Sequence, residues 1–181
     1  MRRRVTFSRN LTLSLSRTCR CYCKYCAFAT HQPHLHAPDE VLKILDRAAG
    51  RHRVKELLVL TGEKPEVNAG VAAKLAEYGH EDFTAYVVWT CERALERGLL
   101  PHTNLGVLAR EDLARLREVT ASQGLMLESI SERLMGRERA VLAVAPARTR
   151  QRQREIPAER DATTHTPGGF YGRADAARGC E

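Results

Sequence analysis

The chain has 181 residues, which is enough for one domain with a buried core. Its composition, 43% apolar and 28% charged residues, is typical of a soluble globular protein, and no apolar run approaches the length that crosses a bilayer. The basic start MRRRVTFSRN lacks the long apolar segment of a signal peptide, so we expect a cytoplasmic protein.

The first half of the chain predicts a strand, a helix and a second strand. Asn10–Ser16 alternates polar and apolar residues, which is typical of a strand. A helix should begin near Pro38, with acidic residues in its first turn, and end at Gly50. Leu57–Leu60 is a short continuous apolar run, which predicts a strand buried on both faces.

The second half continues this alternation. We expect helices over residues 71–78, 82–97 and 111–119, a strand within residues 99–105 and a fourth strand over residues 125–129. Strands that alternate with helices predict parallel βαβ units, and therefore an α/β fold.

Polar and cysteine-rich segments lie at the C-terminal ends of three of the four predicted strands. They are Cys19–Cys26, Thr61–Glu63 and Glu128–Ser129. In parallel α/β folds, functional residues lie in the loops at the C-terminal ends of the strands. We therefore expect these three segments to meet at one end of the sheet.

The last part of the chain differs in composition. From residue 136 to residue 181 the sequence is rich in arginine and alanine and has almost no periodic apolar pattern. We therefore expect a core domain over residues 1–135, followed by a basic, disordered or poorly ordered tail over residues 136–181.

The net charge of +7 is large enough to suggest a nucleic-acid partner. The positive charge lies at the two ends, however: the first 17 residues hold five arginines and no acid, and a further excess lies in the last 46 residues. The middle of the chain is nearly balanced. This distribution favours solvated basic ends over a nucleic-acid-binding surface.

Four cysteines lie within the stretch TCRCYCKYC, residues 18–26. In a reducing cytosol such a cluster indicates metal ligands or redox groups rather than structural disulfides. Cys19, Cys23 and Cys26 have the spacing C-x3-C-x2-C, and three thiolates on one loop can each bind one iron of a cubane cluster. The fourth iron then remains open to a small molecule, and Cys21 is not expected to be a cluster ligand.

Zinc is the alternative for this stretch. The four cysteines could bind zinc with His31, His34 or His36, in a non-catalytic module whose basic tail contacts nucleic acid. A zinc site usually combines two separate ligand pairs, whereas these cysteines crowd one short segment. The crowding favours an iron–sulfur cluster.

The cysteine spacing, placed between a strand and a helix, resembles the radical S-adenosylmethionine (SAM) superfamily. Thr61-Gly62-Glu63 is similar to the glycine–glutamate motif of that superfamily, with Thr61 in place of the first glycine. The resemblance implies a partial TIM-type barrel, a 4Fe–4S cluster, and SAM bound at the open iron and cleaved to a 5′-deoxyadenosyl radical.

Four longer phrases are similar to the family of 7,8-didemethyl-8-hydroxy-5-deazariboflavin (FO) synthases, the CofG type, which also forms the N-terminal half of fused FO synthases. They are YCKYCAF, LTGEKPEVN, GLLPHTNLGVL and LMLESISERL, within residues 5–135. The resemblance implies that a hydroxybenzyl–ribitylimino–dihydrouracil adduct is converted to the deazaflavin with loss of ammonia. It also implies an electron donor and a partner radical SAM enzyme that makes the adduct.

The resemblance assigns site residues but no catalytic proton donor or acceptor. The cluster ligands it implies are Cys19, Cys23 and Cys26. The residues it implies for SAM or substrate are Tyr25, Gly62, Glu63, Asn104 and Glu128.

The family's barrel has about six strands, whereas only four are predicted here, and the resemblance ends near Met135. We therefore expect this chain to be a truncated, frame-shifted form that is inactive alone.

Overall fold

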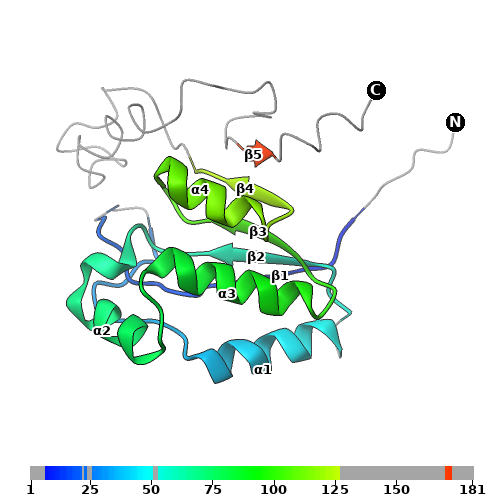
Figure 1. Ribbon diagram of the computed structural model, residues 1–181, viewed down its shortest axis with the longest axis horizontal. Coiled ribbons are helices and arrows are strands. Elements are labelled where there is room, and N and C mark those ends of the chain that lie inside the picture. Colours follow the sequence, from blue (N-terminus) through cyan, green and yellow to red (C-terminus); the bar gives the residue numbers. More distant parts are fainter. Residues whose placement is uncertain (1–6, 22, 24–25, 51–52, 127–169, 173–181) are drawn as a thin grey trace, which may run out of the picture.

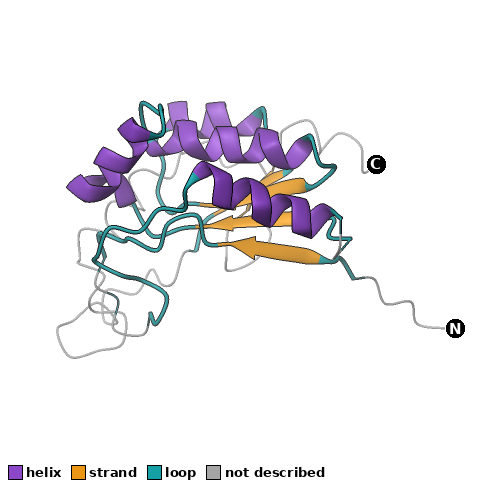
Figure 2. Cartoon of the chain, turned by 90° about the horizontal axis from the view of Figure 1, so that it is seen from below, coloured by secondary structure: helices purple, strands orange, loops and turns teal. Residues whose placement is uncertain are grey.

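The computed structural model describes residues 7–21, 23, 26–50, 53–126 and 170–172. These residues form an α/β fold, as the sequence predicts, with the helices packed on one face of a sheet (Figure 1 and Figure 2). Within these ranges, no helix combines the length and the apolar character that crossing a bilayer requires.

The sheet has five strands in the order β1-β2-β3-β4-β5. The first four run parallel, and β5 is antiparallel to β4. Since consecutive strands are neighbours, the C-terminal ends of β1, β2 and β3 meet at one edge. The strands are β1 Asn10–Leu13, β2 Glu56–Leu60, β3 Leu100–Asn104, β4 Ser122–Gly124 and β5 Phe170–Gly172.

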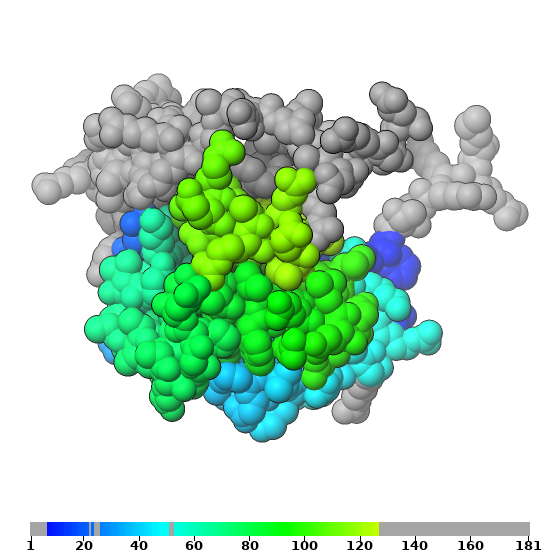
Figure 3. Space-filling view, viewed as in Figure 1, coloured from blue at the N-terminus to red at the C-terminus, as the bar shows by residue number. Residues whose placement is uncertain are grey.

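Four helices connect the parallel strands and form the outer surface seen in Figure 3. Side-chain caps fix where two of them begin: Asp82 accepts the Ala85 N–H at 2.6 Å, and Asn68 accepts the Gly70 N–H at 2.9 Å. The helices are α1 Pro38–Ala49, α2 Ala69–Glu77, α3 Phe83–Leu95 and α4 Arg110–Arg117, and the 3₁₀ turn η1 Pro65–Val67 precedes α2.

The apolar core lies between the sheet and these helices. Leu57 and Val59 of β2 are buried there against a cluster that includes Leu45 of α1 and Tyr86 of α3. The alternate residues of β2, Leu58 and Leu60, are only half-buried. The prediction that this strand is buried on both faces was therefore wrong, because the described helices cover one face of the sheet only.

The fourth strand is displaced from its predicted position. It occupies Ser122–Gly124, whereas the apolar run begins at Leu125, and residues 127–129 lie outside the described residues. Backbone pairing sets this position, since the Ala121 N–H donates to the Pro101 carbonyl at 2.8 Å and Thr103 pairs with Gln123.

The sequence predicted no element at residues 170–172, so β5 is a further difference. Phe170–Gly172 pairs with β4, whose other edge already pairs with β3. A strand edge with unpaired backbone groups accepts another strand regardless of side-chain periodicity, so the pattern of the tail gave no signal.

Candidate cofactor-binding site

A pocket of about 180 Å³ lies at the C-terminal ends of β1, β2 and β3. The sequence predicted that functional residues would gather at this end of the sheet. The pocket is lined by four cysteines and by residues that follow β2 and end or follow β3: Cys19, Cys21, Cys23, Cys26, Thr61, Gly62, Glu63, Asn104 and Gly106.

The cysteine loop is closed at its base by main-chain contacts. Thr18 and Thr30 form a parallel bridge, in which the Cys19 N–H donates to the Thr30 carbonyl at 3.1 Å. The Arg17 guanidinium adds a hydrogen bond to the Phe28 carbonyl at 2.9 Å. These contacts hold the segment that carries the cysteines against the sheet.

Gly62 allows the cysteine loop to pack against the turn that follows β2. Its N–H donates to the Ser16 carbonyl at 2.9 Å. A Cβ at this position would overlap the Thr18 carbonyl and would lie 2.8 Å from the Cβ of Cys19. Only a glycine fits between the two segments, which gives a structural reason for the second residue of the Thr61-Gly62-Glu63 motif.

Glu63 places its carboxylate at the centre of the site. Its side chain is fully buried, and Oε1 lies 3.3 Å from Nη2 of Arg20. On the other side is Gly106, which has φ of +85° and where a Cβ would lie 2.9 Å from Cδ of Glu63. The turn after β3 therefore requires a glycine at this position, because φ is positive and because a Cβ would collide with the Glu63 carboxylate.

Asn104 ends β3 and lines the same pocket. Its carbonyl accepts the Thr61 N–H at 3.3 Å, which joins the ends of β2 and β3. The structure thus brings together six of the eight residues expected in the site. Tyr25 and Glu128 lie outside the described residues.

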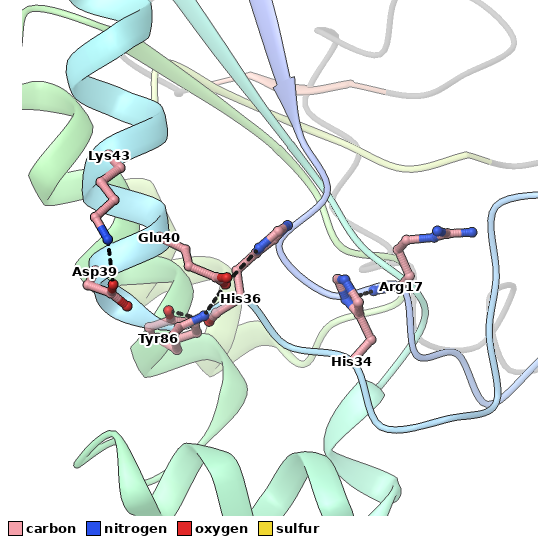
Figure 4. Close-up of polar contacts among 8 residues, drawn as sticks. Arg17, His34, His36, Asp39, Glu40, Lys43 and Tyr86 are labelled. Carbon is pink, nitrogen blue, oxygen red and sulfur yellow. Dashed lines mark hydrogen bonds and ion pairs between the residues drawn. The ribbon is translucent and has the colours of Figure 1, made fainter.

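Of the three histidines that could serve as zinc ligands, His31 is exposed, and His34 and His36 are half-buried. His34 Nδ1 accepts the Arg17 N–H at 3.1 Å, and burial lowers the pKa of this imidazole. His36 Nδ1 lies 3.2 Å from Glu40 at the start of α1, and its carbonyl accepts the Tyr86 hydroxyl (Figure 4). These contacts tie the chain between the cysteine loop and α1 to the fold.

Arg20 and Gly106 are two residues of the site that sequence reasoning missed. Gly106 follows Asn104-Leu105 at a strand end, and a glycine in this position can indicate a turn with positive φ. Arg20 carries no such signal, because its partner Glu63 is 43 residues away in the sequence.

The model of the radical SAM superfamily matches residues 13–157. The chain belongs to the radical SAM superfamily. This membership implies a 4Fe–4S cluster and SAM as cofactors and supports a radical SAM enzyme rather than a zinc-binding module. The match extends past residue 135, where the resemblance in the sequence ended.

Three curated relatives are each named 7,8-didemethyl-8-hydroxy-5-deazariboflavin synthase. The protein of Methanothermobacter thermautotrophicus is 44% identical over 136 residues, which are 74% of this chain and 41% of the relative. That of Archaeoglobus fulgidus is 40% identical, covering 71% of this chain and 39% of the relative. That of Methanocaldococcus jannaschii is 38% identical, covering 72% and 37%.

This radical SAM chain therefore spans about two fifths of the length of the curated relatives it matches, 41%, 39% and 37% in these three cases.

The donor atoms around the pocket fit an iron–sulfur cluster. Sγ of Cys19 accepts the N–H groups of Cys21 at 3.4 Å and of Glu63 at 3.2 Å. Such hydrogen bonds favour the thiolate over the thiol and tune the potential of a cluster bound to it.

A single metal ion fits less well. In the described part of the chain, no three Cys, His, Asp or Glu side chains are grouped closely enough to bind one ion. A closed zinc site needs such a group, because all its ligands meet at one atom. A cubane cluster does not, since each thiolate binds a different iron.

Proposed function

We propose that this chain is the cofactor-binding part of an FO synthase, which forms 7,8-didemethyl-8-hydroxy-5-deazariboflavin. The observation that carries the proposal is the direct contact between two segments of the site. The Glu63 N–H donates to Sγ of Cys19 at 3.2 Å, so a carboxylate and a cysteine thiol lie in one pocket. The name that the relatives share supports the choice of reaction.

Each residue of the pocket has a role in this proposal. Cys19, Cys23 and Cys26 bind the cluster, and Cys21 does not, although all four line the pocket. Glu63 accepts a hydrogen bond from the SAM amino group, for which its buried carboxylate has the right charge. Asn104 offers an amide to SAM or to the substrate. Tyr25 and Glu128 complete the contacts to SAM as the resemblance implies.

The cofactors supply the radical that abstracts a hydrogen atom. The protein binds and orients the cofactors and the substrate, and it excludes water from the site. The substrate is the hydroxybenzyl–ribitylimino–dihydrouracil adduct, and ring closure with loss of ammonia gives the deazaflavin, as in a lyase. A partner radical SAM enzyme makes the adduct, and an electron donor reduces the cluster. We place the protein in the cytoplasm, without a nucleic-acid partner.

Anaerobic reconstitution tests this proposal. The protein is loaded with iron and sulfide, reduced, and incubated with SAM and the adduct, and the products are analysed by mass spectrometry. We expect a brown protein that cleaves SAM, but no deazaflavin from this chain alone. A colourless protein that retains stoichiometric zinc would contradict the proposal.

A further inference from the structure

The buried carboxylate of Glu63 forms an ion pair with the guanidinium of Arg20. Its side chain has 0% exposure, and Nη2 of Arg20, whose side chain is 28% exposed, lies 3.3 Å from Oε1. Burying a carboxylate is costly unless a cation or hydrogen-bond donors accompany it. The Arg20 guanidinium therefore belongs to the environment that holds this carboxylate in the protein interior.

Main-chain contacts fix the position from which Arg20 reaches Glu63. The Arg20 N–H donates to the Glu63 carbonyl at 3.0 Å, and the Glu63 N–H donates to Sγ of the adjacent Cys19. The two residues are thus joined through backbone as well as side chain. A planar guanidinium held in this way loses little further freedom when it bonds the carboxylate.

Arg20 approaches the carboxylate from outside the pocket. Among the described residues, those that line the pocket include Glu63 and Gly106 but not Arg20. Gly106 lies against the carboxylate as well, since a Cβ there would meet Cδ of Glu63 at 2.9 Å. The carboxylate is therefore held by Arg20 and enclosed by Gly106, while Glu63 still borders the pocket.

We propose that Arg20 is a positioning residue that orients the Glu63 carboxylate for the amino group of SAM. This inference rests on the proposed function, which assigns Glu63 to SAM. Arg20 acts through Glu63 and makes no contact with SAM in this account. It follows that removing the guanidinium weakens SAM binding, and that this effect requires the carboxylate of Glu63.

The opposite effect is also physically possible and separates this account from its rival. A guanidinium that occupies the acceptor oxygens would compete with the SAM ammonium group. In that case its removal would tighten SAM binding. The sign of the change in affinity therefore decides between a positioning residue and a competitor.

The test is a double-mutant cycle on SAM affinity. The unaltered chain and the variants Arg20→Met, Glu63→Gln and Arg20→Met/Glu63→Gln are reconstituted anaerobically, and iron and sulfide are quantified. The Kd for SAM is then measured by equilibrium dialysis. We expect Arg20→Met to weaken binding on the order of tenfold, and to add less than about twofold in the Glu63→Gln background. Arg20→Lys should restore part of the affinity, since it retains the charge but not the fork geometry.

Lys43→Met provides the control for loss of one positive charge. Lys43 forms an exposed ion pair with Asp39 on α1 at 2.9 Å and does not line the pocket. Its SAM affinity should match that of the unaltered chain.

Each other outcome overturns a stated part of the account. Unchanged or tighter SAM binding in Arg20→Met, together with weaker binding in Glu63→Gln, would contradict the role of Arg20 but not the assignment of Glu63. Unchanged binding in Glu63→Gln would contradict the assignment of Glu63 and the inference that depends on it. If neither Arg20→Met nor Arg20→Lys assembles a cluster, Arg20 is a structural residue of the cysteine loop and the inference is wrong.

Discussion

At the scale of single residues, the site depends on close approach of three loops. Gly62 lies against the cysteine loop, and Gly106 lies against the Glu63 carboxylate, each at a position where a Cβ would overlap its neighbour. The donor groups of the pocket are held at these contacts, so small changes of volume there should affect cofactor binding before they affect the rest of the fold.

The four cysteines of the loop should differ in their effect on the cluster. Changing Cys19, Cys23 or Cys26 singly to Ala should abolish cluster assembly, because each thiolate binds one iron. Cys21→Ala should assemble it. Iron and sulfide analysis with the visible absorbance spectrum provides the measurement.

Cys91→Ala is the matched control for these variants. Cys91 is fully buried in α3, and burial raises the pKa of its thiol to about 12, so it should not provide a thiolate ligand. Loss of the cluster in Cys21→Ala, with retention in Cys19→Ala, would show that the register of the ligands is wrong.

Glu63→Gln removes the charge of the carboxylate but nearly preserves its shape. We expect SAM binding to weaken by about 1.5–3 kcal/mol, the range for a hydrogen bond to a charged group, while the cluster still assembles. Isothermal titration calorimetry of the reconstituted protein measures this difference. An unchanged SAM affinity would refute the assignment.

Gly62→Ala should disrupt both stability and cluster binding. The added Cβ overlaps the Thr18 carbonyl, and forcing an extra carbon into a packed contact costs about 1–3 kcal/mol. Chemical denaturation and iron content report the two effects.

The control is Gly79→Ala, at a glycine with φ of +80° and no atom within 4 Å of the added Cβ. It should lose about 1–2 kcal/mol through backbone strain alone and bind the cluster normally. Normal cluster content in Gly62→Ala would mean that the loop does not need this close contact.

At the scale of elements, the sequence correctly predicted the helices and strands that are marked by a cap or by an apolar pattern within the element itself. The helix capped by Asp82 and the strand within residues 99–105 were confirmed as α3 and β3, because a cap and an apolar pattern act within a few residues. The position of β4 was predicted wrongly because Gln123 and Gly124 are not apolar residues. Gln123 is nevertheless buried, and its side-chain amide donates to the Leu113 carbonyl at 3.1 Å. Arg20–Glu63 was missed because it depends on tertiary contact.

Asp82 should contribute to the stability of α3 in a pH-dependent way. Burial acts to raise the pKa of this carboxyl, but the hydrogen bonds from Arg115 and from the Ala85 N–H outweigh burial, and the net pKa is lowered. Because the folded-state pKa lies below the unfolded one, the contribution is present above about pH 4 and is lost as pH falls through the folded pKa.

Asp82→Ala should therefore cost about 1 kcal/mol at neutral pH, and less in acid, in urea denaturation followed by circular dichroism. Glu81→Ala is the control, since Glu81 also approaches Arg115, at 3.2 Å, but caps no helix. Equal losses for the two variants would argue against the role of the cap.

At the scale of the whole molecule, the described helices and strands form two layers. Helices cover one face of the sheet, and the half-buried residues Leu58 and Leu60 face the opposite side. The match spans about 41% of the Methanothermobacter relative, so the activity of an FO synthase is a proposal for this chain, as are its substrate and partners. The division into residues 1–135 and 136–181 likewise stays a prediction.

The central claim is that the pocket at the C-terminal ends of β1–β3 binds a 4Fe–4S cluster with one iron open to SAM. Electron paramagnetic resonance of the reduced, reconstituted protein, recorded with and without SAM, tests it most directly. We predict an iron–sulfur signal that changes shape when SAM is added. A protein that gives no iron–sulfur signal, or a signal that SAM leaves unchanged, would contradict the account.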